Sequence, residues 1–312
     1  MADKIATREA YGNALAEFGE KYDIVVLDAD LAAATKTGVF KKKFPDRFID
    51  CGIAEANMMS VAAGIASTGK IPFVSSFAMF AAGRAFEQVR NSVGYPHLNV
   101  KIGATHAGVS VGEDGATHQC NEDIALMRTI PGMIVINPAD GAEARAAVEA
   151  AILHEGPVYM RFGRLAIPYL HGDDFKFEIG KGIKLCDGKD VTIISTGLTV
   201  YMAVEAAKLL ENEGISAEVI DIHTIKPLDV DLVVSSARKT GAVITTEEHS
   251  IIGGLGSAVC EALSENCPTP VIRVGINDVF GKSGKGGELL TEFGLSPENF
   301  VIKAKEAIKL KK

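Results

Sequence analysis

The chain has 312 residues and a formal net charge of -8, and this acidic balance argues against nucleic-acid binding, which needs Lys and Arg clustered on one face. Its five cysteines have no C-x-x-C spacing, so the sequence indicates neither a disulfide framework nor a cysteine zinc site and favours a reducing, cytoplasmic location. Charged residues near the start replace the apolar core of a signal peptide, and no stretch approaches the roughly 18 apolar residues of a membrane span, so we expect neither export nor membrane insertion.

Short β-branched runs alternate with segments of helical period in the first half of the chain. Strands are expected at 23–30, 72–76, 100–104, 133–138 and 158–162, and helices at 55–67, 81–93, 121–129 and 140–154. Asp140 has the residue type and position of an N-cap. This alternation predicts a parallel sheet with helices on both faces and a ligand crevice at the carboxyl ends of the strands.

The pattern fails near residue 165 and resumes in a second, smaller unit. After Pro168, repeated Gly and alternating charges fill residues 169–189, which we interpret as a linker between domains at 1–168 and 190–312. Strands are expected at 191–197, 215–223, 242–248 and 270–275, and helices at 199–213, 229–239 and 256–265. The sequence therefore predicts an α/β protein of two doubly wound domains.

One glycine-rich segment, ATHAGVSVGEDGATHQ at 104–119, has the composition of an active site. It contains His106, Glu113, Asp114 and His118, and its glycines allow turns sharp enough to bring these side chains together. A single histidine here would be read as part of a solvated loop. The cluster of titratable groups beside a strand favours a functional site.

Residues 105–119 resemble the substrate loop of transketolases. Gly52-Ile53-Ala54-Glu55, followed by a run of small residues, is similar to the segment in which thiamine-diphosphate enzymes carry their cofactor-activating glutamate. The two motifs occur in the family's order, and the resemblance covers nearly the whole chain. It implies a pyrimidine-binding thiamine-diphosphate domain followed by a transketolase C-terminal domain.

The resemblance gives Glu55 a catalytic and cofactor-binding role. In the family this glutamate bonds a ring nitrogen of the aminopyrimidine and favours the tautomer that starts the chemistry. Phe77 and Phe80 occupy positions where the family stacks aromatic rings on the aminopyrimidine. Without the resemblance, Glu55 would be read as a partner of a helix dipole and the two phenylalanines as core residues.

The resemblance also implies a substrate site. His106 and His118 would bond the hydroxyl and carbonyl oxygens of the ketol donor and move protons, and Asp114 would read the configuration of a sugar hydroxyl. Arg8 and Arg164 lie at positions similar to the family's phosphate-binding arginines.

One position departs from the family pattern. A serine that helps to bind phosphate usually follows the position of Asp30, and this chain lacks it. Thr35 and Lys36 are the candidate replacements. His249, at the end of an expected strand, is read as structural, with an approach to the rim of the active site as the alternative.

A diphosphate-binding Gly-Asp-Gly segment with downstream asparagine ligands is absent from the sequence. The resemblance therefore implies the smaller subunit of a split transketolase, with no metal ligand assigned to this chain and the Mg²⁺ ligands supplied by an N-terminal partner subunit in an α2β2 assembly. The expected reaction is the transfer of a two-carbon ketol group between sugar phosphates through a thiamine-diphosphate carbanion. The alternatives are an enzyme similar to 1-deoxyxylulose-5-phosphate synthase, a 2-oxo acid dehydrogenase β subunit, or a non-catalytic scaffold; the two histidines of the loop favour transketolase.

Overall fold

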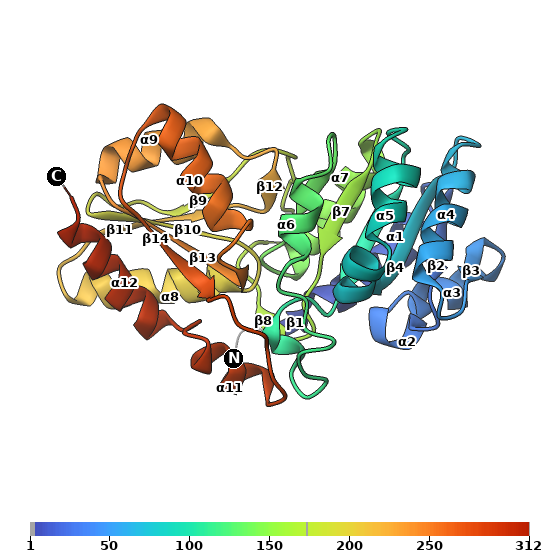
Figure 1. The fold of residues 1–312 in the computed structure, drawn as a ribbon, viewed down its shortest axis with the longest axis horizontal. Helices are drawn as coiled ribbons and strands as arrows, with labels where there is room; N and C mark the ends of the chain where they lie inside the picture. Colours follow the sequence, from blue (N-terminus) through green and yellow to red (C-terminus); the bar gives the residue numbers. More distant parts are fainter. Residues whose placement is uncertain (1–3, 173, 312) are drawn as a thin grey trace.

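The computed structural model describes residues 4–172 and 174–311, which form two α/β units lying side by side (Figure 1). The larger sheet has the strand order β12-β6-β7-β5-β4-β2-β3, and all its strands are parallel except β12. Its members are β2 (Ile24–Asp28), β3 (Phe48–Asp50), β4 (Ile71–Phe77), β5 (Lys101–Thr105), β6 (Ile134–Ile136), β7 (Val158–Arg161) and β12 (Thr224–Lys226). The predicted α/β class and the five predicted strands of this unit are confirmed.

Helices cover both faces of this sheet because its strands are apolar on both sides. Val26 and Phe73 pack on the face of α1 and α7, whereas Leu27 and Val74 pack on the face of α4 and α6. The N-cap predicted at Asp140 is confirmed, since its carboxylate accepts a hydrogen bond from the Glu143 amide. The helices are α1 (Thr7–Phe18), α2 (Ala32–Thr35), α3 (Gly38–Lys43), α4 (Glu55–Ala66), α5 (Phe86–Gln88), α6 (Asp123–Arg128) and α7 (Gly141–Leu153).

The segment expected to be one regular helix at 81–93 differs from that prediction. Two π-helical stretches, Met79–Arg84 and Val89–Gly94, flank the single turn of α5. The Ala85 amide accordingly bonds the Phe80 carbonyl five residues earlier. Such widened turns rotate the side chains that follow, and they are common at functional sites.

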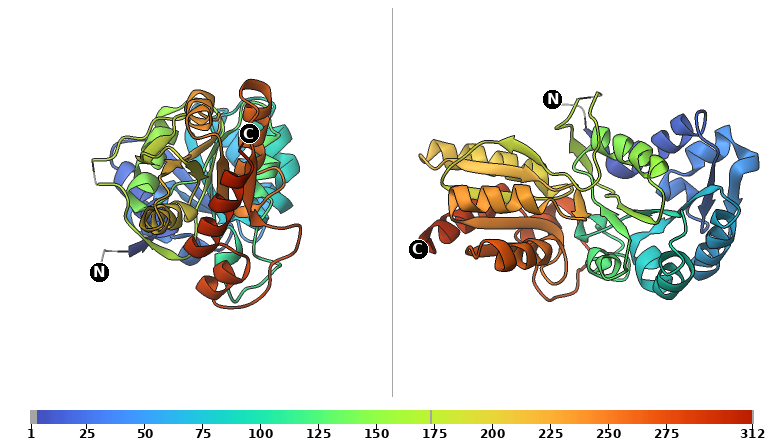
Figure 2. Two further views of the ribbon diagram at one scale, coloured as in Figure 1. Left: turned by 90° about the vertical axis from the view of Figure 1, so that its left-hand side faces the viewer. Right: turned by 90° about the horizontal axis from the view of Figure 1, so that it is seen from above.

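The second unit is a five-stranded sheet of order β14-β13-β10-β11-β9, in which only the pairing of β9 with β11 is antiparallel. Helices α8 and α12 cover one face and α9 and α10 the other (Figure 2). Helices α11 and α12, like α1, are additions to the predicted elements. The strands are β9 (Ile183–Cys186), β10 (Val191–Ser195), β11 (Ala217–Asp221), β13 (Val243–Ser250) and β14 (Val271–Ile276), and the helices are α8 (Thr199–Asn212), α9 (Val230–Thr240), α10 (Leu255–Asn266), α11 (Gly286–Glu292) and α12 (Pro297–Lys309).

The two units are joined by shared secondary structure and by buried charge. Strand β12 leaves the second unit and pairs with β6 of the first sheet, whereas β1 (Lys4–Ala6) and β8 (Ala166–Pro168) pair within the first unit. The buried Arg161 guanidinium bonds both Asp123 and the Glu248 carbonyl, which tightly links β7, α6 and β13. Within the described residues, no helix is long and apolar enough to cross a membrane.

Candidate active site

The expected site residues lie along the edge where the parallel strands of the first sheet end. Phe77 closes β4, and His106 directly follows β5, which is hydrogen-bonded to β4 in parallel register. Glu55 begins α4, shortly after β3 ends on the same sheet. The carboxyl edge of a parallel sheet is the usual position of a ligand crevice in this class of fold.

Glu55 is a buried carboxylate with one strong partner. It is 2% exposed, and both of its oxygens accept hydrogen bonds from Arg84 Nη1, at 3.0 and 2.9 Å. The Arg84 guanidinium also lies 4.4 Å from the centroid of the Phe80 ring. Arg84 was missing from the sequence prediction, and the π-helical turn that directs it toward Glu55 has no signature in the hydrophobic period.

The two phenylalanines and the two histidines form one aromatic cluster. The Phe77 and Phe80 rings stack at 5.9 Å between centroids, and Phe77 also stacks on His106 at 3.8 Å. His118 meets Phe80 edge-on at 5.3 Å. The structure thus brings together the four aromatic side chains that the sequence singled out.

His106 is held in one orientation and kept neutral. Its backbone is left-handed, with φ of 55°, and its side chain is buried. Arg8 Nη1 donates to Nε2 at 2.7 Å, so the ring proton resides on Nδ1, which lies 2.9 Å from Thr105 Oγ1. Burial, together with the positive charges of Arg8 and Arg164, lowers the pKa of His106 to about 3. The imidazole is therefore uncharged at neutral pH.

Arg8 and Arg164 place two guanidinium groups beside this histidine. Arg8 donates to the Ala34 carbonyl, and its buried Nε has no hydrogen-bond partner. Burial, and then the charge of Arg164, lowers the pKa of Arg8. Two like charges at close range beside an unpaired donor favour the binding of an anion.

Asp114 lies on the exposed part of the loop. Its carboxylate is 3.9 Å from Arg164 Nη1, and Glu113 lies 3.6 Å from the same nitrogen. Arg164 also bonds the Val111 carbonyl. Asp114, the residue expected to read a sugar hydroxyl, therefore lies beside an arginine that the resemblance assigned to phosphate.

The second unit holds this loop in place. Glu248 Oε1 accepts a hydrogen bond from the Ser110 amide at 2.6 Å, and Gln119 Nε2 donates to the Lys282 carbonyl at 2.9 Å. Helix α11 and the segment before it lie beside the loop, at the bottom of the view in Figure 1. His249 is fully buried, with its pKa lowered to about 4 chiefly by burial, and its Nε2 accepts from the Ala125 amide. These contacts support a structural role for His249.

The proposed replacement of the phosphate-binding serine by Thr35 is wrong. Thr35 is fully buried, and its hydroxyl donates to Asp28 Oδ2 at 2.7 Å, so it supports the turn instead of facing a ligand. Lys36 remains the candidate. Its ammonium is 3.2 Å from Glu9, and its charge contributes to the lowered pKa of His106.

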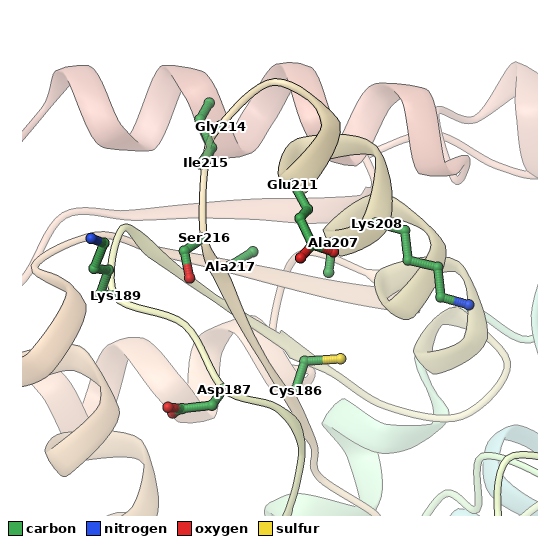
Figure 3. Close-up of a pocket in the computed structure, with 10 residues that line it drawn as sticks. All are labelled: Cys186, Asp187, Lys189, Ala207, Lys208, Glu211, Gly214, Ile215, Ser216 and Ala217. Atoms are coloured by element: carbon green, nitrogen blue, oxygen red, sulfur yellow. The ribbon is translucent and has the colours of Figure 1, made fainter.

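Two surface pockets differ in their relation to this site. One adjoins it and is lined by Met79, Thr117, Gln119, Val279 and Phe280, among others. The other, shown in Figure 3, lies in the second unit between the end of β9 and α8 and contains none of the site residues. The first pocket is not lined by the expected site residues themselves, but it includes Met79 and Thr117, the sequence neighbours of Phe80 and His118.

The residues present fit one part of thiamine diphosphate. A buried carboxylate and a stacked aromatic pair are the groups needed by an aminopyrimidine ring, with one polar edge and two apolar faces. Arg84 now covers one face of Phe80 and engages both Glu55 oxygens, so a ring binding there must share or displace it.

Comparisons with known proteins agree with this geometry. The family model for the transketolase pyrimidine-binding domain matches residues 3–168, and the model for the transketolase C-terminal domain matches residues 180–300. A Methanocaldococcus jannaschii protein named "Putative transketolase C-terminal section" is 51% identical over 306 residues, which is 97% of this chain and 96% of that protein. The 6-deoxy-6-sulfo-D-fructose transketolase subunit of a Clostridium species is 47% identical, over 97% of this chain and 95% of that protein.

A solved structure described as a split-gene transketolase, in an inactive β4 tetramer, superimposes with a TM-score of 0.92. It is 55% identical, over 99% of this chain and all of that one. The chain therefore belongs to the transketolase family and contains its pyrimidine-binding and C-terminal domains.

Proposed function

We propose that this chain is the pyrimidine-side subunit of a split transketolase, which transfers a two-carbon ketol group from a ketose phosphate to an aldose phosphate together with a diphosphate-binding N-terminal subunit. The observation that carries the proposal is an unbroken series of contacts from Glu55 through Arg84, Phe80 and Phe77 to His106. This series supports the proposal because it connects a buried carboxylate with a neutral imidazole.

Glu55 is the acid that faces the cofactor in this proposal. A buried carboxylate can hold a proton or a hydrogen bond at a ring nitrogen with little competition from water. Bound thiamine diphosphate supplies the carbon centre that carries the ketol group. Arg84 lies within contact distance of both Glu55 and Phe80, so it controls how freely the carboxylate can turn toward a ring.

His106 and His118 bind the reacting part of the sugar. Because His106 is neutral, it can accept or donate a proton at a hydroxyl or carbonyl oxygen without first losing a charge. Arg8 and Arg164 bind the terminal phosphate, since both carry positive charge beside the histidine and Arg8 retains an unpaired Nε donor.

The partner subunit supplies the Mg²⁺ ligands and the diphosphate contacts. Large apolar side chains near the site are exposed to solvent, including Ile53 at 75% and Phe280 at 90%. Exposed apolar groups around an incomplete site indicate a surface covered in the working assembly. The split-gene structure is described as an inactive β4 tetramer, which supports the need for a second kind of subunit, and we propose α2β2 as the active form.

The two arginines do not decide which anionic group the sugar carries at its end. The Clostridium relative is named for a sulfonated fructose, and a sulfonate and a phosphate both suit a pair of arginines. A phosphorylated ketose is the substrate we propose, and the matching sulfonated ketose belongs in the same assay as a competitor.

The experiment is a ketol-transfer assay from xylulose 5-phosphate to ribose 5-phosphate, with the partner subunit, thiamine diphosphate and Mg²⁺. Glu55→Gln should lower kcat by about 10²-fold or more, the usual contribution of a positioned acid. Glu87→Gln, an exposed carboxylate on α5, is the matched control and should leave kcat unchanged. Full activity of Glu55→Gln would overturn the role of the carboxylate.

A further inference from the structure

A second group of buried titratable side chains lies where the two units meet. Glu143 stands in the first turn of α7, Asp221 ends β11, and His171 belongs to the segment that connects the units. Both carboxylates are fully buried, and the His171 side chain is 8% exposed. One ligand atom from each lies within 4.8 Å of the other two. Three separate parts of the chain thus bring an imidazole and two carboxylates to one point.

The two carboxylates of this cluster have fewer hydrogen-bond donors than the neighbouring carboxylate of Asp140. Neighbouring Asp140 accepts hydrogen bonds from three amides, those of Glu143, Leu170 and His171, at 2.6 to 2.8 Å. By contrast, Glu143 Oε1 and Asp221 Oδ1 are buried without any hydrogen-bond partner. Glu143 Oε1 points into the cluster, 3.8 Å from His171 Nε2. A buried acceptor with no donor is costly, so each of the two carboxylates is left with an oxygen that a positive partner would stabilise.

The other oxygen of each carboxylate already has a partner. Glu143 Oε2 accepts a hydrogen bond from the Ala139 amide, and Asp221 Oδ2 lies 3.4 Å from His171 Nε2. Each carboxylate thus keeps one oxygen that a proton or a cation can satisfy.

The separations favour a cation. His171 Nε2 is 3.4 Å from Asp221 Oδ2 and 3.8 Å from Glu143 Oε1. Ligands about 2.0–2.1 Å from a tetrahedral zinc ion lie roughly 3.3 Å apart, so the two distances from His171 need to shorten by about half an ångström at most, and the two carboxylate ligand atoms already lie within 4.8 Å of each other. One imidazole with two carboxylates suits Zn²⁺, whereas Mg²⁺ prefers six oxygens and keeps several waters.

We propose that Glu143, His171 and Asp221 form a binding site for one zinc ion that ties α7, the connecting segment and β11 together, with water as the fourth ligand. This site contains none of the residues placed at the cofactor or the sugar. Its role is to stabilise the arrangement of the two units, and it is separate from the Mg²⁺ of the diphosphate.

The test is zinc binding by the full chain, stripped of metal and prepared without a histidine tag. We expect one zinc ion per chain by elemental analysis after dialysis, and a rise in Tm of about 5 °C at a hundredfold excess over Kd. Co²⁺ in its place should show the visible absorption of a tetrahedral site. Glu143→Gln, which keeps an acceptor for the Ala139 amide, and His171→Gln should abolish all three signals, whereas the exposed His97→Asn should change none.

Two results would overturn the proposal. The wild-type chain binding no stoichiometric zinc would show that the carboxylates share a proton instead. Zinc retained by both Glu143→Gln and His171→Gln would place the ion elsewhere, for example on the free cysteines. Zinc binding by the wild-type chain tests the proposal even if a variant folds poorly.

Discussion

Glu248 connects the second unit to the substrate loop and gives the sharpest prediction about stability. Burial raises the pKa of its carboxyl to about 7 from an ordinary 4.5, although the charge of Arg161 partly opposes this. Between pH 4.5 and about pH 7, the folded chain thus keeps a proton on Glu248 that the unfolded chain has already released. A raised pKa of this kind gives stability at low pH that is lost as the pH rises through about 7.

Replacing Glu248 by Gln removes this titration and keeps an oxygen that accepts from the Ser110 amide. A difference of about 2.5 pKa units corresponds to about 2–3 kcal/mol between pH 5 and pH 8. The stability of Glu248→Gln relative to wild type should therefore increase by that amount from pH 5 to pH 8. Burial also raises the pKa of Glu247 to about 7. Because Glu247 is present in both chains, its contribution to the difference in stability cancels.

The assay is urea unfolding at both pH values, followed by circular dichroism. Glu205→Gln, an exposed carboxylate on α8, serves as the control and should show no such pH dependence. A constant difference between Glu248→Gln and wild type at pH 5 and pH 8 would refute the reasoning, since Glu248 would then titrate alike in the folded and unfolded chains.

Three further predictions concern the site. Arg84→Ala leaves Glu55 buried without its cation and should lower the free energy of unfolding by about 1–2 kcal/mol. This loss is smaller than for a fully buried ion pair because Arg84 is 52% exposed. An unchanged midpoint of urea denaturation would contradict this prediction. Arg164→Met should raise KM for a ketose phosphate tenfold or more and leave KM for a non-phosphorylated ketol donor unchanged, and equal effects on both donors would remove it from the phosphate site. Gly108→Ala should destabilise the loop, because φ is +80° and the new methyl would lie 2.3 Å from Glu248 Cδ, and an unchanged Tm would count against this packing.

The sequence predicted the elements whose signals are local. The helix that begins at Gly141 follows from its N-cap residue and its alanine-rich period, and the strands follow from their β-branched runs. Helix α12 carried a local signal that was overlooked: Ser296 caps it by accepting from the Asn299 amide, and Pro297 occupies its first turn.

Other features depend on contacts that no local pattern encodes. The hydrogen-bonding shift that makes 79–84 a π-helix leaves the residue types unchanged, and so the approach of Arg84 to Glu55 could not be predicted. The pairing of β12 with β6 joins residues about ninety positions apart. The burial of Thr35 likewise depends on its hydrogen bond to Asp28, whose orientation is fixed only by the fold.

The candidate site was predicted mainly through its resemblance to a family, and the structure added the relations among its residues. Sequence spacing alone indicated that His106 and His118 belong to one loop, but not that His106 stacks on Phe77 and that His118 meets the Phe80 ring. The neutrality of His106 required knowledge of burial and of Arg8, which is 98 residues away in sequence.

We propose that half of a transketolase active site lies in this chain and the other half in a partner. The most direct measurement is a titration of the chain with the diphosphate-domain subunit from the same genome, following ketol transfer in the presence of thiamine diphosphate and Mg²⁺. We predict no turnover by either protein alone and activity that saturates at one partner per chain. Turnover by this chain alone, or a saturated complex without ketol transfer, would contradict the account.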